Sequence, residues 1–120
     1  METPDLADLI WLFEDEPTRK YDDLDWPVGL HSFRLTRGGL AVLFSLDPLV
    51  GEAYISLYAG EEEIAYLGRL RQLDRLTIVR GPSGYEGLQL WFPSDTNEPL
   101  ALQTKPQIRL SWNIRDVGTW

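Results

Sequence analysis

Residues 107–115 alternate between polar and apolar side chains without a break. The apolar members are Ile108, Leu110, Trp112 and Ile114. Side chains on a strand point to opposite faces with period two, so this segment is predicted to be a strand with one buried face and one solvent face. One-sided burial is typical of antiparallel sheets, because parallel sheets are covered on both faces.

The chain from residue 30 onward supplies the partners that such a strand needs. Alternating or β-branched segments separated by Gly and Pro turns predict strands at 31–36, 40–46, 52–58, 63–67, 76–80, 85–92, 100–104 and 107–115. Gly87 within one of them indicates a bulge. Residues 68–74 are ambiguous: Leu67, Leu70 and Leu73 have helical spacing, which allows a bend or one helical turn. About seven or eight short strands favour a sandwich, a partly open barrel or a strongly curved meander.

The N-terminal residues 4–14 are predicted to form a helix. Its apolar stripe consists of Leu6, Leu9, Ile10 and Phe13, with the 3.6-residue period of an amphipathic helix. Thr3 is the expected N-cap, and Pro17 forces a stop nearby. We expect this helix to pack on the sheet or to cover one of its edges; partner binding is the alternative.

The predicted fold is therefore mainly β, of the α+β class, with an N-terminal helix on an antiparallel body. A length of 120 residues favours a single domain, with an acidic helical segment at 1–29 and the β body at 30–120. No apolar run is long enough for a membrane helix, and the acidic N-terminus is unlike a signal peptide. A cytoplasmic location is the expectation.

Negative charge is concentrated at the N-terminal end of the chain. The whole chain has a net charge of −8, and residues 1–25 alone contain nine acidic and two basic side chains, a net charge of −7. Such a field attracts basic partners and repels nucleic acid, although solubility is an alternative role. The expected binding carboxylates are Asp15, Glu16, Asp22, Asp23 and Asp25. The last three do not predict a metal site, because the glycine and distal glutamate of an EF-hand loop are missing.

The residues that usually carry catalysis are scarce. There is no cysteine and a single histidine, His31, and no Gly-x-Ser-x-Gly turn accompanies it. His31 is therefore expected to be structural or solvent-facing, and neither a metal nor a cofactor is expected. Glu52, Asp74 and Glu86 leave a carboxylate-only enzyme as a weak alternative.

Aromatic side chains are the other candidate binding groups. Tyr54, Tyr58 and Trp91 lie opposite the apolar face of their strands, so they form an exposed patch if they are neighbours. Trp112, in contrast, is expected in the core. The basic residues at 69–80 follow three consecutive glutamates and lie on both sides of Asp74. These acids are expected to neutralise them, so nucleic-acid binding is not expected.

In size, acidity, single-domain layout and absent catalytic groups, the chain resembles the small immunity proteins that bacteria pair with polymorphic toxins. The resemblance implies a non-enzymatic protein that blocks a basic toxin sterically and electrostatically, with Asp15, Glu16, Asp22 and Asp23 facing the toxin. A small-molecule carrier with a barrel-like pocket is the second hypothesis, and the carboxylate-only enzyme is the third.

Overall fold

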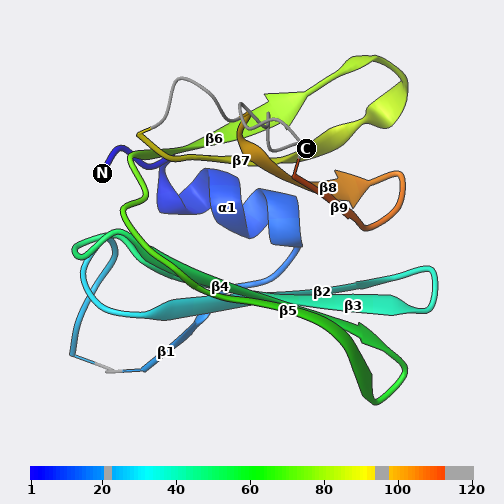
Figure 1. The fold of residues 1–120 in the computed structure, drawn as a ribbon, viewed down its shortest axis with the longest axis horizontal. Helices are drawn as coiled ribbons and strands as arrows, with labels where there is room; N and C mark the ends of the chain where they lie inside the picture. The colour runs from blue at the N-terminus through cyan, green and yellow to red at the C-terminus, as the bar shows by residue number, and fades with distance from the viewer. Residues whose placement is uncertain (21–22, 94–97, 113–120) are drawn as a thin grey trace, which may run out of the picture.

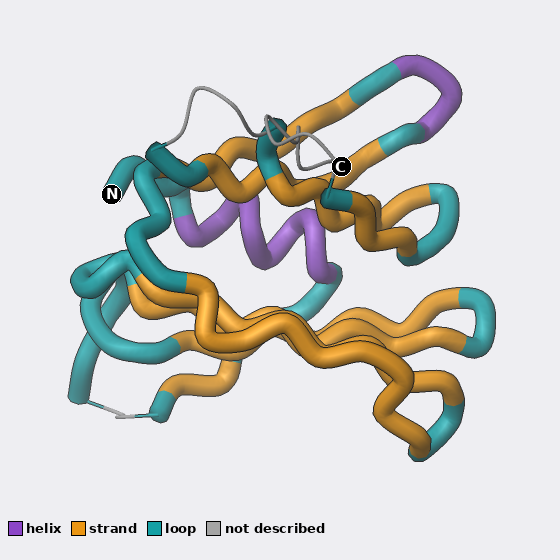
Figure 2. The backbone as a smooth tube through the Cα atoms, viewed as in Figure 1, coloured by secondary structure: helices purple, strands orange, loops and turns teal. Residues whose placement is uncertain are grey.

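The computed structural model describes residues 1–20, 23–93 and 98–112. It consists of two antiparallel sheets with one α-helix, α1 (Leu6–Phe13), lying between them (Figure 1). Figure 2 shows the same layering, with the helix in purple and the strands in orange. The predicted mainly β, α+β architecture is confirmed, and each sheet is an open meander rather than a closed barrel.

The five-stranded sheet has the order β1-β2-β3-β4-β5, and the four-stranded sheet has the order β6-β7-β8-β9. The strands of the first sheet are β1 (Thr18–Arg19), β2 (His31–Arg37), β3 (Leu40–Asp47), β4 (Glu52–Ala59) and β5 (Glu62–Leu70). Those of the second are β6 (Arg75–Arg80), β7 (Glu86–Trp91), β8 (Leu100–Lys105) and β9 (Arg109–Ser111), with a short 3-10 turn, η1 (Pro82–Gly84), between β6 and β7. Every predicted strand is present, and β1 is an additional one.

Helix α1 forms the middle layer of the molecule. Leu9, Leu12 and Phe13 are buried, and the Phe13 ring stacks on Phe33 of β2 at 5.2 Å and on Phe44 of β3 at 5.9 Å between ring centroids. The helix begins later than predicted, with Asp5 rather than Thr3 at its N-cap. The prediction that it packs on a sheet is correct but incomplete, because one core cluster joins the helix to both sheets.

The five-stranded sheet presents an apolar face to the helix. Phe33 of β2 pairs with Phe44 of β3, which pairs with Ile55 of β4, and all three are buried. Paired residues of an antiparallel sheet share a face, so the alternate residues of these strands point away from the helix.

Strand β5 continues through the segment that was ambiguous in the sequence. Leu67 pairs with Ile55, and Leu70 pairs with Ala53. Two residues of β5 therefore stand opposite one residue of β4, which is a β-bulge. The bulge places Leu67 and Leu70 near the same inner face and produces the helix-like spacing, so of the two alternatives left open by the sequence the helical turn is not formed.

The four-stranded sheet covers the other side of α1. Leu88 of β7 pairs with Ile78 of β6 and Leu102 of β8. A bulge does lie beside Gly87, but on the neighbouring strand: Glu86 pairs with Lys105 and Gly87 with Gln103, so Thr104 of β8 is the extra residue. A Cβ on Gly87 would lie 2.5 Å from the Leu102 carbonyl oxygen. Glycine is required at this position because the neighbouring backbone leaves no room for a side chain.

Strand β9 is shorter than the predicted strand 107–115. The alternation itself is confirmed as far as the structure describes it: Ile108 is buried, Arg109 is exposed and Leu110 is partly buried. Trp112, predicted in the core, packs against the core cluster but is only partly buried. Its ring stacks on Phe92, and its indole N–H donates to the Glu98 carbonyl at 3.2 Å. Residues 113–115 lie outside the described residues.

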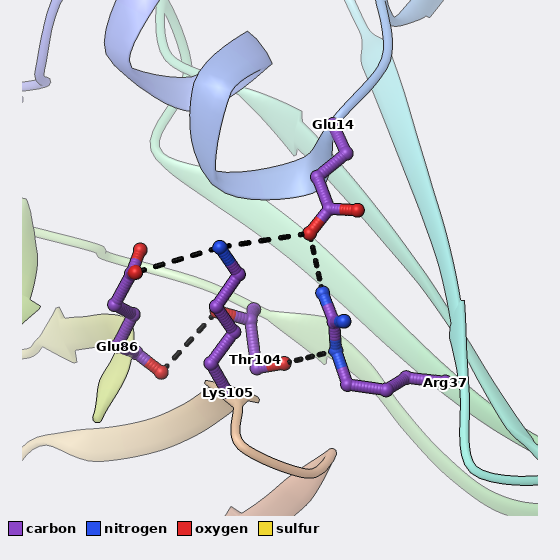
Figure 3. Close-up of polar contacts among 5 residues, drawn as sticks. All are labelled: Glu14, Arg37, Glu86, Thr104 and Lys105. Atoms are coloured by element: carbon purple, nitrogen blue, oxygen red, sulfur yellow. Dashed lines mark hydrogen bonds and ion pairs between the residues drawn. The ribbon is translucent and has the colours of Figure 1, made fainter. Parts of the chain in front are cut away.

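Polar side chains join the two sheets beyond the end of the helix (Figure 3). Arg37 of β2 donates to the Thr104 carbonyl of β8 at 2.8 Å and forms an ion pair with Glu14. Lys105 of β8 lies 3.8 Å from the same Glu14 carboxylate and 3.5 Å from Glu86. Glu14, the C-cap residue of α1, therefore links the helix to both sheets.

Candidate binding surfaces

The connection that follows α1 carries the first group of predicted binding residues. Asp15 and Glu16 are exposed in the turn after the helix, where Asp15 Oδ1 accepts a hydrogen bond from the Glu16 backbone N–H at 2.8 Å. Asp23 and Asp25 are exposed in the loop between β1 and β2. Asp22 lies outside the described residues.

Two carboxylates of the N-terminal segment are matched by the chain's own cations. Asp25 lies 2.7 Å from Arg19, and Glu14 pairs with Arg37 and Lys105. The remaining described acids of this segment form no ion pair with another described residue: Glu2, Asp5, Asp8, Asp15, Glu16 and Asp23. The excess negative charge of the segment therefore remains available at the surface.

A pocket of about 350 Å³ lies between the helix and this acidic connection. Side chains of α1 form one wall, and those of the connection and the start of β2 form the others: Leu6, Ile10, Glu16, Pro17, Arg19, Asp25, Trp26 and His31. Glu16 and Asp25 were predicted as binding residues, whereas Trp26 and His31 were not. Only Trp26 carried a signal, as a large aromatic side chain in an otherwise acidic connection.

His31 is a buried wall residue of this pocket, with an exposed fraction of 1%. Its Nε2–H donates to the Val28 carbonyl at 2.9 Å, and its ring meets the edge of Trp26 with centroids 5.3 Å apart. Nδ1 has no hydrogen-bond partner among the described residues. The sequence left His31 as either a structural or a solvent-facing residue, and its burial shows that it is structural.

The predicted aromatic patch is only partly formed. Tyr54 and Tyr58 share the outer face of the five-stranded sheet, since Tyr54 pairs with Ser45 and Tyr58 with Ala41. Tyr66 of β5 joins them: a Cβ at Gly68 would lie 2.3 Å from the Tyr66 hydroxyl oxygen and 2.9 Å from Tyr54 Cδ1. Tyr66 is 56% exposed and was not among the predicted binding residues.

Trp91 belongs to the other sheet and therefore cannot complete that patch. It is half-buried on β7, where its indole N–H donates to Thr77 Oγ1 at 3.0 Å. The guanidinium carbon of Arg75 lies 4.4 Å from the ring centroid, a cation–π contact. The condition for a patch that includes Trp91 is therefore not met, because its strand and that of Tyr54 and Tyr58 lie in different sheets, and the role of Trp91 in binding stays a prediction.

The carboxylates considered for catalysis do not converge. Glu52 is on β4, and the Arg69 guanidinium hydrogen-bonded to it at 2.9 Å lowers the pKa of that carboxyl. Glu86 is on the other sheet, facing Lys105. Within the described ranges no group of three or more histidine or acidic residues is placed to hold a metal ion, and no helix there is long and apolar enough to span a membrane.

Neither a protein-family model nor a curated protein sequence matches this chain. A match does exist among solved structures, with a chain of a contact-dependent growth inhibition toxin–immunity protein complex from Klebsiella pneumoniae 342. The TM-score is 0.77, and the match covers 93% of this chain and 95% of that chain at 17% sequence identity. The two chains share a fold. This agrees with the resemblance to toxin-associated immunity proteins that the layout of the sequence suggested.

Proposed function

We propose that this chain is a non-enzymatic immunity protein that binds and blocks a basic toxin in the bacterial cytoplasm. The observation that carries the proposal is the shared fold, which extends over nearly the whole of both chains. The chain that shares this fold belongs to a complex of a toxin with an immunity protein, so a protein is also the partner expected here.

The charge distribution supports a basic partner. The net charge is −8, and six acids near the N-terminus form no ion pair with any cation in the described part of the chain. Exposed charge of one sign steers an oppositely charged protein and accelerates association, whereas it adds less to final affinity. We assign the first encounter to Asp15, Glu16, Asp23 and Asp25, and the tyrosine face around Tyr54 is a second candidate contact surface.

The alternative functions have weaker support. A carrier needs an apolar cavity, but among the described residues the space between the sheets is filled by α1 and the rings stacked on Phe13. A catalytic histidine would be expected to contact a nucleophile or a carboxylate, but the Nε2–H of His31 donates to the Val28 carbonyl and Nδ1 has no partner among the described residues. The carboxylate-only enzyme lacks a convergent pair, because Glu52 and Glu86 lie on different sheets.

A growth-protection assay tests the proposal. The reading frame adjacent to the gene for this chain would be expressed in a bacterial host alone, together with this chain, and together with a non-cognate immunity protein. We expect growth arrest by the neighbour alone, and protection only by this chain. Arrest caused by this chain alone would instead identify it as the toxic component.

The salt dependence of binding tests the electrostatic part. Between roughly 50 and 200 mM salt, the association rate with the purified partner should fall by about tenfold or more, while the dissociation rate changes little. A rate that is independent of ionic strength would contradict steering by the acidic segment.

A further inference from the structure

We propose that the pocket beside α1 accepts one arginine side chain of the partner protein. This deepens the proposed function for its partner, but the chemistry of the pocket can be tested without that partner. The pocket combines apolar walls with two carboxylates at its margin, Glu16 and Asp25. An arginine side chain has the matching composition, with an apolar stem and a planar cationic end.

Charge alone would not define a site, but the walls add shape and chemistry. Leu6 and Ile10 of α1, together with Pro17, supply apolar surface for the stem of the arginine side chain. Trp26 supplies an indole ring, and guanidinium groups stack favourably on such rings. A volume of about 350 Å³ is sufficient for a single side chain and small for a whole ligand of drug size.

An arginine of the chain itself already demonstrates part of this geometry. Arg19 lines the pocket, and its Nη1 donates to Asp25 Oδ1 at 2.7 Å. The Asp25 side chain is 92% exposed, and ion pairs at such exposed positions contribute little to stability. A partner arginine can therefore displace Arg19 from Asp25 at little cost, and Glu16 has no cation to displace among the described residues.

His31 provides an independent observation: the wall of the pocket contains an unsatisfied hydrogen-bond acceptor. Its Nε2–H is used by the Val28 carbonyl, so Nδ1 of the neutral ring is an acceptor. That acceptor has no partner among the described residues, although the side chain is buried and lines the pocket. Buried acceptors are normally satisfied, and a guanidinium brings five N–H donors. Nδ1 itself has almost no accessible surface, so an entering guanidinium meets the Glu16 and Asp25 carboxylates first and reaches Nδ1 only after the neighbouring side chains shift.

The test uses the intact chain and a minimal probe, Nα-acetyl-arginine amide. Nitrogen-15 NMR would follow the Trp26 indole during titration, and Nα-acetyl-citrulline amide would serve as a neutral probe of nearly the same shape. We expect saturable shifts with a dissociation constant on the order of millimolar for the arginine probe, and about tenfold weaker binding of citrulline. Equal binding of the two probes would overturn the proposal.

Matched variants locate the probe. Glu16→Gln should weaken arginine binding by about tenfold, and Asp8→Asn, which removes the same charge from an exposed α1 position outside the pocket, should leave it nearly unchanged. Arg19→Gln should strengthen binding, because the competing internal cation is removed. Equal losses in the two acid variants would mean that the general field, and not the pocket, attracts the probe.

The two proposals can fail separately. Probe binding without protection of growth would refute the immunity function and retain the arginine pocket. Protection of growth without specific probe binding would refute the arginine pocket and retain the immunity function. When both hold, Glu16→Gln is expected to weaken the complex with the basic partner more than Asp8→Asn does.

Discussion

Truncation of Phe13 to alanine tests whether α1 is the centre of the core. The Phe13 side chain is 1% exposed and stacks on two rings, Phe33 at 5.2 Å and Phe44 at 5.9 Å between centroids. Replacement by alanine removes the whole ring from a site that is enclosed by a sheet and its own helix. The backbone on either side is held by hydrogen bonds, so the cavity can collapse only in part.

The expected loss follows from three contributions. Burying a phenylalanine side chain contributes about 1.5–3 kcal/mol, and each aromatic pair adds about 0.5–1.5 kcal/mol. Because the substitution removes both stacked pairs, we expect the upper part of the range for such truncations, about 4–5 kcal/mol. That is a large fraction of the roughly 5–15 kcal/mol that stabilise a domain of ordinary size.

Urea unfolding followed by far-ultraviolet circular dichroism would measure the loss. Trp11→Ala is the matched control, because it removes an even larger ring from the same helix at a position that is 47% exposed. Trp11 contacts the Arg80 and Lys105 cations at 4.3 and 5.3 Å, so we expect a loss of only about 1–2 kcal/mol there. A Phe13→Ala loss below that of Trp11→Ala would refute the central position of the helix.

Two further predictions concern single side chains. Trp112→Ala should lower the free energy of unfolding in urea by about 2–3 kcal/mol, which is less than a full core truncation. The ring is only partly buried, but its indole N–H donates a hydrogen bond to the Glu98 carbonyl that the variant loses. A loss of about 4–5 kcal/mol would instead show that Trp112 is as important as a fully buried core residue. The lowered pKa of Glu52 means that its ion pair with Arg69 stabilises the fold above pH 4.5, the ordinary pKa, and that this stabilisation disappears as pH falls through the folded-state pKa. Arg69→Gln should therefore raise the pKa of the Glu52 carboxyl in a carbon-13 NMR titration, and an unchanged value would contradict the assignment.

The strands were predictable because their side chains obey simple local rules. Period-two alternation and glycine turns located the strands of both sheets, and Gly87 indicated a bulge in the ladder although the extra residue belongs to β8. The rules failed where an extra residue interrupts the ladder: in β5, Leu67 and Leu70 are three residues apart, which imitates a helix. The two-residue strand β1 was missed because both of its side chains are exposed and have no pattern.

Long-range arrangement was the part that local patterns could not provide. An apolar helix stripe does not show whether one sheet or two will cover it, so the central position of α1 was not predicted. Alternation along a strand shows which aromatic side chains face solvent, but not which sheet the strand joins. Trp91 was therefore grouped with Tyr54 and Tyr58. The pocket was missed for the same reason, since His31 and Trp26 meet Glu16 only after the connection folds back on the helix.

The position of α1 between the sheets has a consequence for synthesis on the ribosome. The helix is made before either sheet, but one of its two walls includes Leu100 and Leu102 of β8, which follow β1 to β7 in the chain. Its leucines therefore stay exposed until most of the protein has emerged. Completion of the fold must follow translation of β8, and earlier chain fragments should bind chaperones that recognise apolar segments.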